Sequence, residues 1–213
     1  MMTSADLVLE ELEKDALTEL VNIAVSRAAK NLREMVGRQV FLSVPRINLV
    51  GRQQAIDILD EREMDRLVAV HQVFEGDITG RALLIFPEER SLELVRAVAG
   101  PDHSLEDIID LEQEALAETG NIILNSCLAT IANLLRRSLR VSLPEVIRGT
   151  GTDFFNLAPP PLPGEVVLFL YINFTVKDND ITGYIAMLMD MPSLAVLKGL
   201  LCEFIERIGG TDK

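Results

Sequence analysis

Residues 19–32 read ELVNIAVSRAAKNL, and residues 118–135 read ETGNIILNSCLATIANLL. Each stretch opens with a glutamate and reaches an asparagine three residues later. Apolar residues then recur at the three- and four-residue spacing of an amphipathic helix. A shift of 99 residues lays the first stretch on the second. A repeated supersecondary unit governs the whole fold, so this repeat is the first feature to establish.

The repeat extends well beyond these two stretches. VFLSVP at 40–45 aligns with LRVSLP at 139–144 at the same shift. A second anchor lies downstream, where the tripeptide Ile-Thr-Gly occurs at 78–80 and again at 181–183, a shift of 103. Two ordered anchors at nearly the same shift are hard to obtain by chance. Four positions therefore correspond between the copies: Asp15 with Glu114, Glu19 with Glu118, Asn22 with Asn121, and Pro45 with Pro144.

The pattern predicts an α+β fold in which residues 1–213 form a single, internally duplicated domain. The two repeats span about 6–100 and 105–209, and residues 101–104 link them. Each half reads as a long helix, a strand, an irregular piece, a hairpin and a closing helix. We expect the two hairpins to share one antiparallel sheet with pseudo-twofold symmetry. The expected elements are long helices at 6–36 and 105–137, a strand at 39–44 stopped by Pro45, and hairpins at 67–86 and 166–189.

Polar residues of each long helix fall on one narrow stripe, opposite the apolar side that should meet the core. Residues three and four apart share a helical face, so Asp15, Glu19 and Asn22 lie together in the first copy. Glu114, Glu118 and Asn121 form the same stripe in the second. A polar stripe is usually only the solvated side of an amphipathic helix. Here the same Glu-x-x-Asn pair recurs at the same distance from a proline, which favours a function.

Composition excludes several classes of function. The formal net charge of −13 argues against a nucleic-acid partner, because an acidic surface repels phosphate backbones. No apolar run approaches a membrane span, and the acidic N-terminus lacks the features of a signal peptide, so we expect a cytoplasmic protein. The two cysteines and two histidines show no metal-ligand spacing. The glycine-rich residues 149–152 are expected to open no helix after a strand, so they lack the context of a phosphate-binding loop.

The repeated motif resembles the signature of the CheC/CheX/FliY phosphatases of bacterial chemotaxis. That signature is Asp or Ser, three residues, Glu, two residues, Asn, twenty-two residues and Pro. The first copy matches it fully, and the second departs only at Glu114, where Asp or Ser is usual. The resemblance covers essentially the whole chain, and it is strongest to members with two motifs. It implies hydrolysis of the aspartyl phosphate on the response regulator CheY.

The resemblance also implies roles for the motif residues. Asn22 and Asn121 would orient the attacking water, and Glu19 and Glu118 would dock the regulator. Asp15, Glu114, Pro45 and Pro144 would support the motif. No cofactor is expected on this chain, since Mg²⁺ would sit in the site of CheY. The implied partners are phosphorylated CheY and the deamidase CheD, with the chain a monomer. The alternatives are a non-catalytic module that binds phosphorylated CheY, a regulator of CheD, and an unrelated symmetric scaffold.

Overall fold

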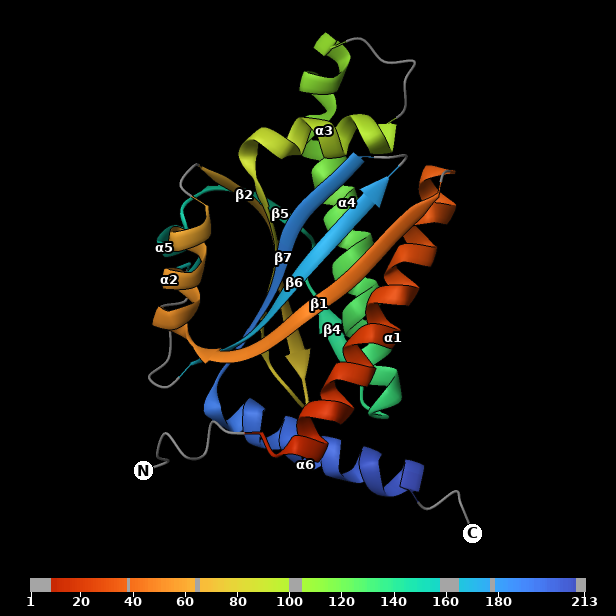
Figure 1. Ribbon diagram of the computed structural model, residues 1–213, viewed down its shortest axis with the longest axis vertical. Coiled ribbons are helices and arrows are strands. Elements are labelled where there is room, and N and C mark those ends of the chain that lie inside the picture. The colour runs from red at the N-terminus through yellow and green to blue at the C-terminus, as the bar shows by residue number, and fades with distance from the viewer. Residues whose placement is uncertain are drawn as a thin grey trace.

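The computed structural model describes residues 9–37, 39–63, 66–99, 105–157, 165–176 and 179–209. The described residues form one seven-stranded sheet, and all of its strand pairs are antiparallel (Figure 1). The strand order is β1-β6-β7-β3-β2-β4, and β5 also pairs with β2. The strands are β1 (Val40–Gly51), β2 (Leu67–Gly76), β3 (Gly80–Pro87), β4 (Leu139–Val141), β5 (Glu145–Gly149), β6 (Val166–Val176) and β7 (Asn179–Met189).

The two halves of the chain exchange their edge strands. β1 belongs to the first half, but among the described residues it pairs only with β6 of the second. In return, β4 and β5 of the second half pair with β2 of the first. The hairpins β2–β3 and β6–β7 meet at the centre of the sheet, where β3 pairs with β7. The predicted α+β fold with an antiparallel sheet is confirmed, and the strand order is symmetric about this central pair.

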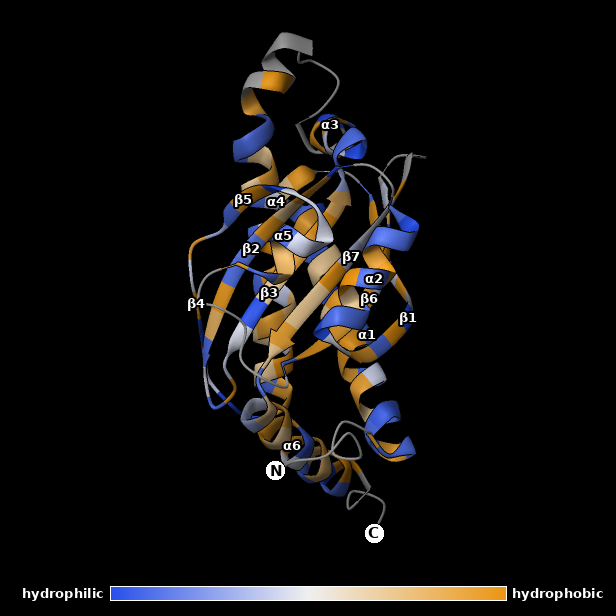
Figure 2. Cartoon of the chain, turned by 90° about the vertical axis from the view of Figure 1, so that its left-hand side faces the viewer, coloured by the Kyte–Doolittle hydropathy of each residue, from blue (hydrophilic) through white to orange (hydrophobic). Residues whose placement is uncertain are grey.

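Helices cover both faces of the sheet (Figure 1). The long helices α1 (Glu11–Val36) and α4 (Leu105–Leu134) lie on one face, and the shorter α2 (Arg52–Arg62) and α5 (Gly151–Phe155) lie on the other. α3 (Glu88–Ala99) and α6 (Met191–Gly209) close the two ends of the molecule. Figure 2 shows the hydrophobic colours concentrated on the strands and on the helix sides that face them.

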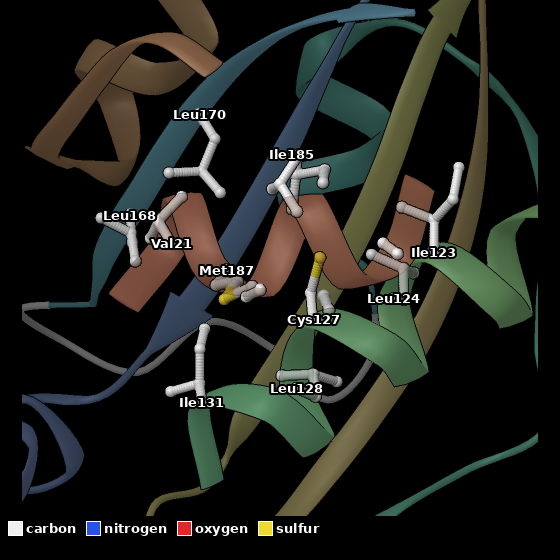
Figure 3. Packing of buried hydrophobic residues seen from close by; sticks show 14 of the residues in the cluster. Val21, Ile123, Leu124, Cys127, Leu128, Ile131, Leu168, Leu170, Ile185 and Met187 are labelled. Carbon is white, nitrogen blue, oxygen red and sulfur yellow. The ribbon is translucent and has the colours of Figure 1, made fainter. Parts of the chain in front are cut away.

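Burial on both faces explains the continuous apolar runs of the strands. Along β6, even-numbered residues such as Leu168 and Leu170 pack under α1 and α4 (Figure 3). Odd-numbered residues such as Val167 and Phe169 pack under α2 and α5. Each face of the sheet thus has its own hydrophobic cluster, and the motif helices rest on the larger one.

Several predicted boundaries differ from the structure. α1 begins at Glu11, with residues 6–8 outside the described part of the chain, and it ends as predicted at Gly37. That glycine adopts a left-handed φ of 67°, and its N–H donates to the Arg33 carbonyl at 2.9 Å. α4 ends at Leu134, three residues before the predicted end. The segment predicted to be irregular after β1 is helix α2, so that prediction was wrong.

Two predictions about strands and turns were also wrong. β1 does not stop at Pro45; it continues to Gly51 through a register irregularity between Ser43 and Arg46. A proline has no N–H to give to a ladder and is therefore tolerated at such a bulge. Residues 149–152 do follow a strand and do open a helix, because β5 ends at Gly149 and α5 starts two residues later. That helix has only five residues, and Thr150 caps it.

Candidate functional site: the outer sides of α1 and α4

The two motif helices lie side by side and antiparallel on one face of the sheet (Figure 1). The Asn31 side-chain amide on α1 donates to the Ser126 hydroxyl on α4 at 2.9 Å. α6 contacts the start of α1 and the end of α4, because Lys198 lies 3.7 Å from Glu13 and Arg207 donates to the Leu134 carbonyl. Because both helices pack their apolar sides on the same face of the sheet, their outer sides face the same side of the molecule.

The motif side chains lie on these outer sides, away from the core. Asp15, Glu19 and Asn22 are exposed on α1, and we call this group the first site. Glu114 and Glu118 are exposed on α4, whereas Asn121 is half-buried, and these three form the second site. The opposite sides of the helices are buried in the larger cluster, with Leu20, Ala24 and Ala28 on α1 and Ile123, Cys127 and Ile131 on α4.

The two sites are distinct positions and do not merge into one pocket. Asn22 precedes the cross-helix contact at Asn31 by nine residues, and Asn121 precedes Ser126 by five. Because the helices are antiparallel, these offsets point in opposite directions. At 1.5 Å per residue the two asparagines are about 21 Å apart along the helix axes. The two sites therefore occupy separate stretches of the helix surface.

The side chain of Asn22, the asparagine of the first site, is not held by its described neighbours. Within the described residues Asn22 makes no side-chain hydrogen bond, and the next polar residue one turn along, Ser26, is also exposed. The strands beneath α1 turn only apolar side chains toward it. On β6 these residues are Val166, Leu168, Leu170, Ile172 and Phe174, and on β1 they are Val40, Leu42, Val44, Ile47 and Leu49. Nothing on these strands can hold the amide.

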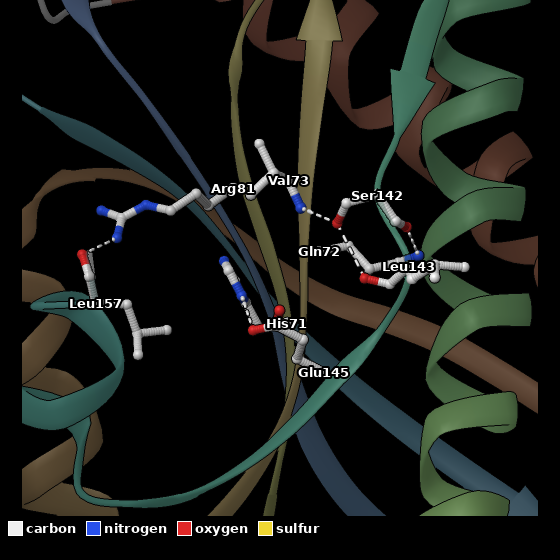
Figure 4. A network of polar contacts seen from close by, with 8 residues as sticks. All are labelled: His71, Gln72, Val73, Arg81, Ser142, Leu143, Glu145 and Leu157. Carbon is white, nitrogen blue, oxygen red and sulfur yellow. Dashed lines mark hydrogen bonds and ion pairs between the residues drawn. The ribbon is translucent and has the colours of Figure 1, made fainter. Parts of the chain in front are cut away.

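The asparagine of the second site is held from two directions. Its Oδ1 accepts a hydrogen bond from Gln72 Nε2 at 3.1 Å and another from Asn125 Nδ2 at 2.6 Å. Gln72 lies on β2 with no exposed surface, and its Nε2 also donates to the backbone carbonyl of Ser142 at 2.9 Å (Figure 4). The Ser142 hydroxyl accepts from the backbone N–H of Val73 at 3.0 Å, which fixes the Ser142 backbone against β2.

Sequence reasoning missed Gln72, although the sequence carries a signal for it. Residues of β2 alternate between the α4 side and the α5 side of the sheet. Besides Gln72, the residues on the α4 side are Val68, Val70 and Phe74. One amide in an otherwise apolar row, fully buried, must find a hydrogen-bond partner or destabilise the fold. The partner was not predictable without the register of α4 over β2.

A glycine brings α4 close to this strand. A Cβ on Gly120 would lie 2.5 Å from Val70 Cβ, so a side chain there would force the helix away from β2. The corresponding residue of α1 is Val21, which is buried.

The first and last residues of the second motif copy lie close together in the structure. Glu114 and Pro144 line the same shallow depression of the surface. Pro45, the counterpart of Pro144, lies at the irregularity of β1.

Among the described residues, neither a metal site nor an activated Cys127 thiol adds a further reactive group. Among the described residues no group of three or more His, Cys, Asp or Glu side chains could hold a metal ion. Burial raises the pKa of the Cys127 thiol to about 12, which leaves it protonated and unreactive. No helix in the described part of the chain is long and apolar enough to cross a membrane.

The chain resembles known proteins in sequence and in fold. No family model matches the chain. The chain is 28% identical over 141 residues to the CheY-P phosphatase CheC of Bacillus subtilis, which covers 65% of this chain and 67% of that protein. It is 22% identical over 176 residues to the putative CheY-P phosphatase CheC1 of Halobacterium salinarum, covering 82% of this chain and 89% of the relative. These relatives confirm the predicted resemblance to the CheC/CheX/FliY phosphatases.

Solved structures give the same fold. The crystal structure of Thermotoga maritima FliY superposes with a TM-score of 0.68 at 20% sequence identity, covering 94% of this chain and 98% of that one. At that identity the likeness speaks for the fold alone. The chain has both motif copies on adjacent helices of a duplicated fold, and the two copies differ in how their asparagine is held.

Proposed function

We propose that this chain is a phosphatase that hydrolyses the aspartyl phosphate of phosphorylated CheY. Its relatives in B. subtilis and H. salinarum are named as CheY-P phosphatases, the second as a putative one. The observation that carries the proposal is the Glu-x-x-Asn pair, which lies on the outer side of both motif helices. A cytoplasmic location, a monomeric state and an interaction with CheD stay predictions from the sequence.

The proposed mechanism is one of positioning. A water molecule attacks the phosphorus, the bond between phosphorus and the aspartyl oxygen breaks, and the products are inorganic phosphate and a free carboxylate. The phosphoaspartate and its Mg²⁺ belong to the regulator, so little covalent chemistry falls to this chain. Asn22 and Asn121 would orient the water in line with the breaking bond. A neutral amide suits this role because it does not repel the phosphoryl group.

The glutamates would set the register of docking. Glu19 lies three residues before Asn22, and Glu118 three before Asn121, so each carboxylate shares the face of its amide. An exposed carboxylate can form a charge-assisted bond with a lysine or arginine of the partner. The net charge of −13 fits a partner that presents basic residues at its contact surface.

Release of inorganic phosphate from phosphorylated CheY, with and without this chain, tests the proposal. Asn22→Ala combined with Asn121→Ala should lower the stimulated release by about 100-fold or more, because a positioned amide is lost from both sites. Circular dichroism should show that the double variant is folded. Its melting temperature should fall somewhat, because Asn121→Ala takes one acceptor from the buried Gln72 amide, whereas the exposed Asn22 makes no such contact. Near-wild-type release would remove the asparagines from the mechanism.

The same assay separates the proposal from the binding-module alternative. A module that only binds phosphorylated CheY would leave the release of phosphate unchanged or slow it, while still forming a complex. A phosphatase speeds release at amounts well below those of its substrate, because it turns over.

A further inference from the structure

We propose that Gln72 is a positioning residue that fixes the amide of Asn121 and makes the second site the faster of the two. The inference rests on the proposed phosphatase function and adds a residue outside the motif to it. Gln72 comes from the first half of the chain and Asn121 from the second, so each copy contributes to this site.

The orientation of both amides follows from one backbone atom. The Ser142 carbonyl can only accept a hydrogen bond, so the group of Gln72 that lies 2.9 Å from it must be the NH₂. The same nitrogen lies 3.1 Å from Asn121, and its remaining N–H needs an acceptor there. Asn121 therefore turns its oxygen toward Gln72 and keeps its own NH₂ for other contacts.

Asn125 completes the restraint from within α4. Its Nδ2 donates to the same Asn121 oxygen at 2.6 Å, one helical turn further along. A carbonyl oxygen has two lone pairs, and both are now occupied. The amide is consequently held in one rotamer with its two N–H donors free of these contacts. One of them can donate to the oxygen of the attacking water and leave the second lone pair of that water for phosphorus.

The first site cannot build the same restraint. Only apolar residues face α1 from β1 and β6, and Val21 replaces the glycine that lets α4 approach β2. Ser26 stands where α4 has Asn125, and it is exposed. Asn22 must therefore lose its side-chain freedom each time it orients a water, whereas Asn121 has already lost it on folding.

The test isolates each site before removing Gln72. Asn22→Ala leaves only the second site, and Asn121→Ala leaves only the first. In the Asn22→Ala background, Gln72→Leu should lower kcat for phosphate release about tenfold with little change in KM, because docking through Glu118 is untouched. In the Asn121→Ala background, the same substitution should leave kcat within twofold, since the first site does not use Gln72.

A second variant guards against a folding effect in the buried position. Asn125→Ala removes the other donor from a half-buried place on α4 and should also lower kcat only where Asn121 is present. The side-chain amide resonances of Asn121 should broaden or shift in both variants, whatever the activity. Melting temperatures of all variants should be measured beside the kinetics.

Several results would overturn the inference while sparing the proposed function. These are an unchanged or raised kcat for Gln72→Leu and Asn125→Ala in the Asn22→Ala background, an equal loss in both backgrounds, or no residual turnover in Asn22→Ala alone. Failure of the proposed function looks different, because the wild-type chain itself would then leave the release of phosphate from phosphorylated CheY unchanged or slow it.

Discussion

The first site and the second site carry the same glutamate and asparagine on neighbouring helices, but the layer beneath them differs. Under Asn121 lie a buried amide and a glycine, and under Asn22 lie apolar side chains. The motif is preserved at the surface, whereas the restraint on its amide comes from residues that no motif contains. Two copies with the same glutamate and asparagine are thus expected to work at different rates.

Separating the two halves of the chain should have the largest effect, because each half supplies strands to the other. In a fragment of residues 1–100, β1 would lose β6, the strand with which it pairs in the described sheet, and β3 would lose β7. Unpaired edges leave backbone groups without partners and invite association. We expect the fragment to be unfolded or self-associated by size-exclusion chromatography and circular dichroism. A soluble monomeric fragment that melts cooperatively would show that the halves are separate domains, against the single-domain prediction.

Filling the space at Gly120 should weaken the second site and the fold together. In Gly120→Ala the new Cβ would meet the branched side chain of Val70, so α4 must move away from β2. Overpacking of this kind costs about 1–3 kcal/mol, which exceeds the helix-propensity gain of up to about 1 kcal/mol. The free energy of unfolding, measured by denaturant titration, should fall, and the turnover of the second site should fall with it.

Gly199 supplies the matched control. It also lies inside a long helix, α6, but nothing lies within 4 Å of a Cβ placed there. Gly199→Ala should therefore raise the free energy of unfolding by about 0.5–1 kcal/mol and leave both sites unaffected. If both substitutions stabilise the chain equally, the close approach of α4 to β2 does not matter for stability.

Charge reversal at Glu19 and at Glu118 should weaken binding of the partner to a similar extent at the two sites. Glu19 and Glu118 are both exposed, and the difference between the sites lies in the amides. Glu19→Lys and Glu118→Lys should each weaken binding of phosphorylated CheY by roughly two- to tenfold at low salt, and the loss should shrink as salt screens the charges. Glu61→Lys makes the same change on α2, across the sheet, and should leave the affinity unchanged. An affinity that stays constant in both motif variants at low salt would remove the glutamates from docking.

The order of elements and the motif positions could be read from the sequence, but the environment of the motif could not. The helical period and the repeat were enough to predict α1, α4, both hairpins and the outward stripe. α2 was missed because residues 52–62 lack a strong apolar stripe, with only Ala55, Ile56 and Leu59 buried. The exchange of β1, β4 and β5 between the halves, and the contact of Gln72 with Asn121, depend on tertiary pairing over long sequence separations. Local patterns carry no register of that kind.

His71 gives the smallest expected effect and tests the other face of β2, the strand that carries Gln72. It follows Val70 and precedes Gln72 on β2, and its imidazole points into the α2–α5 side, 3.7 Å from Glu145 (Figure 4). Burial lowers the pKa of His71, and nearby Arg81 lowers it further, although Glu145 opposes both. The unfolded chain therefore takes up a proton as the pH falls through about 6.5, before folded His71 does. The free energy of unfolding should be highest above that pH and should decline below it, by less than the Gly120→Ala effect.

Melting temperatures at pH 7.5 and 5.5 should differ more for the wild type than for His71→Phe. His103→Gln serves as the control for the second histidine. An identical pH dependence in wild type and His71→Phe would show that His71 does not couple protons to folding.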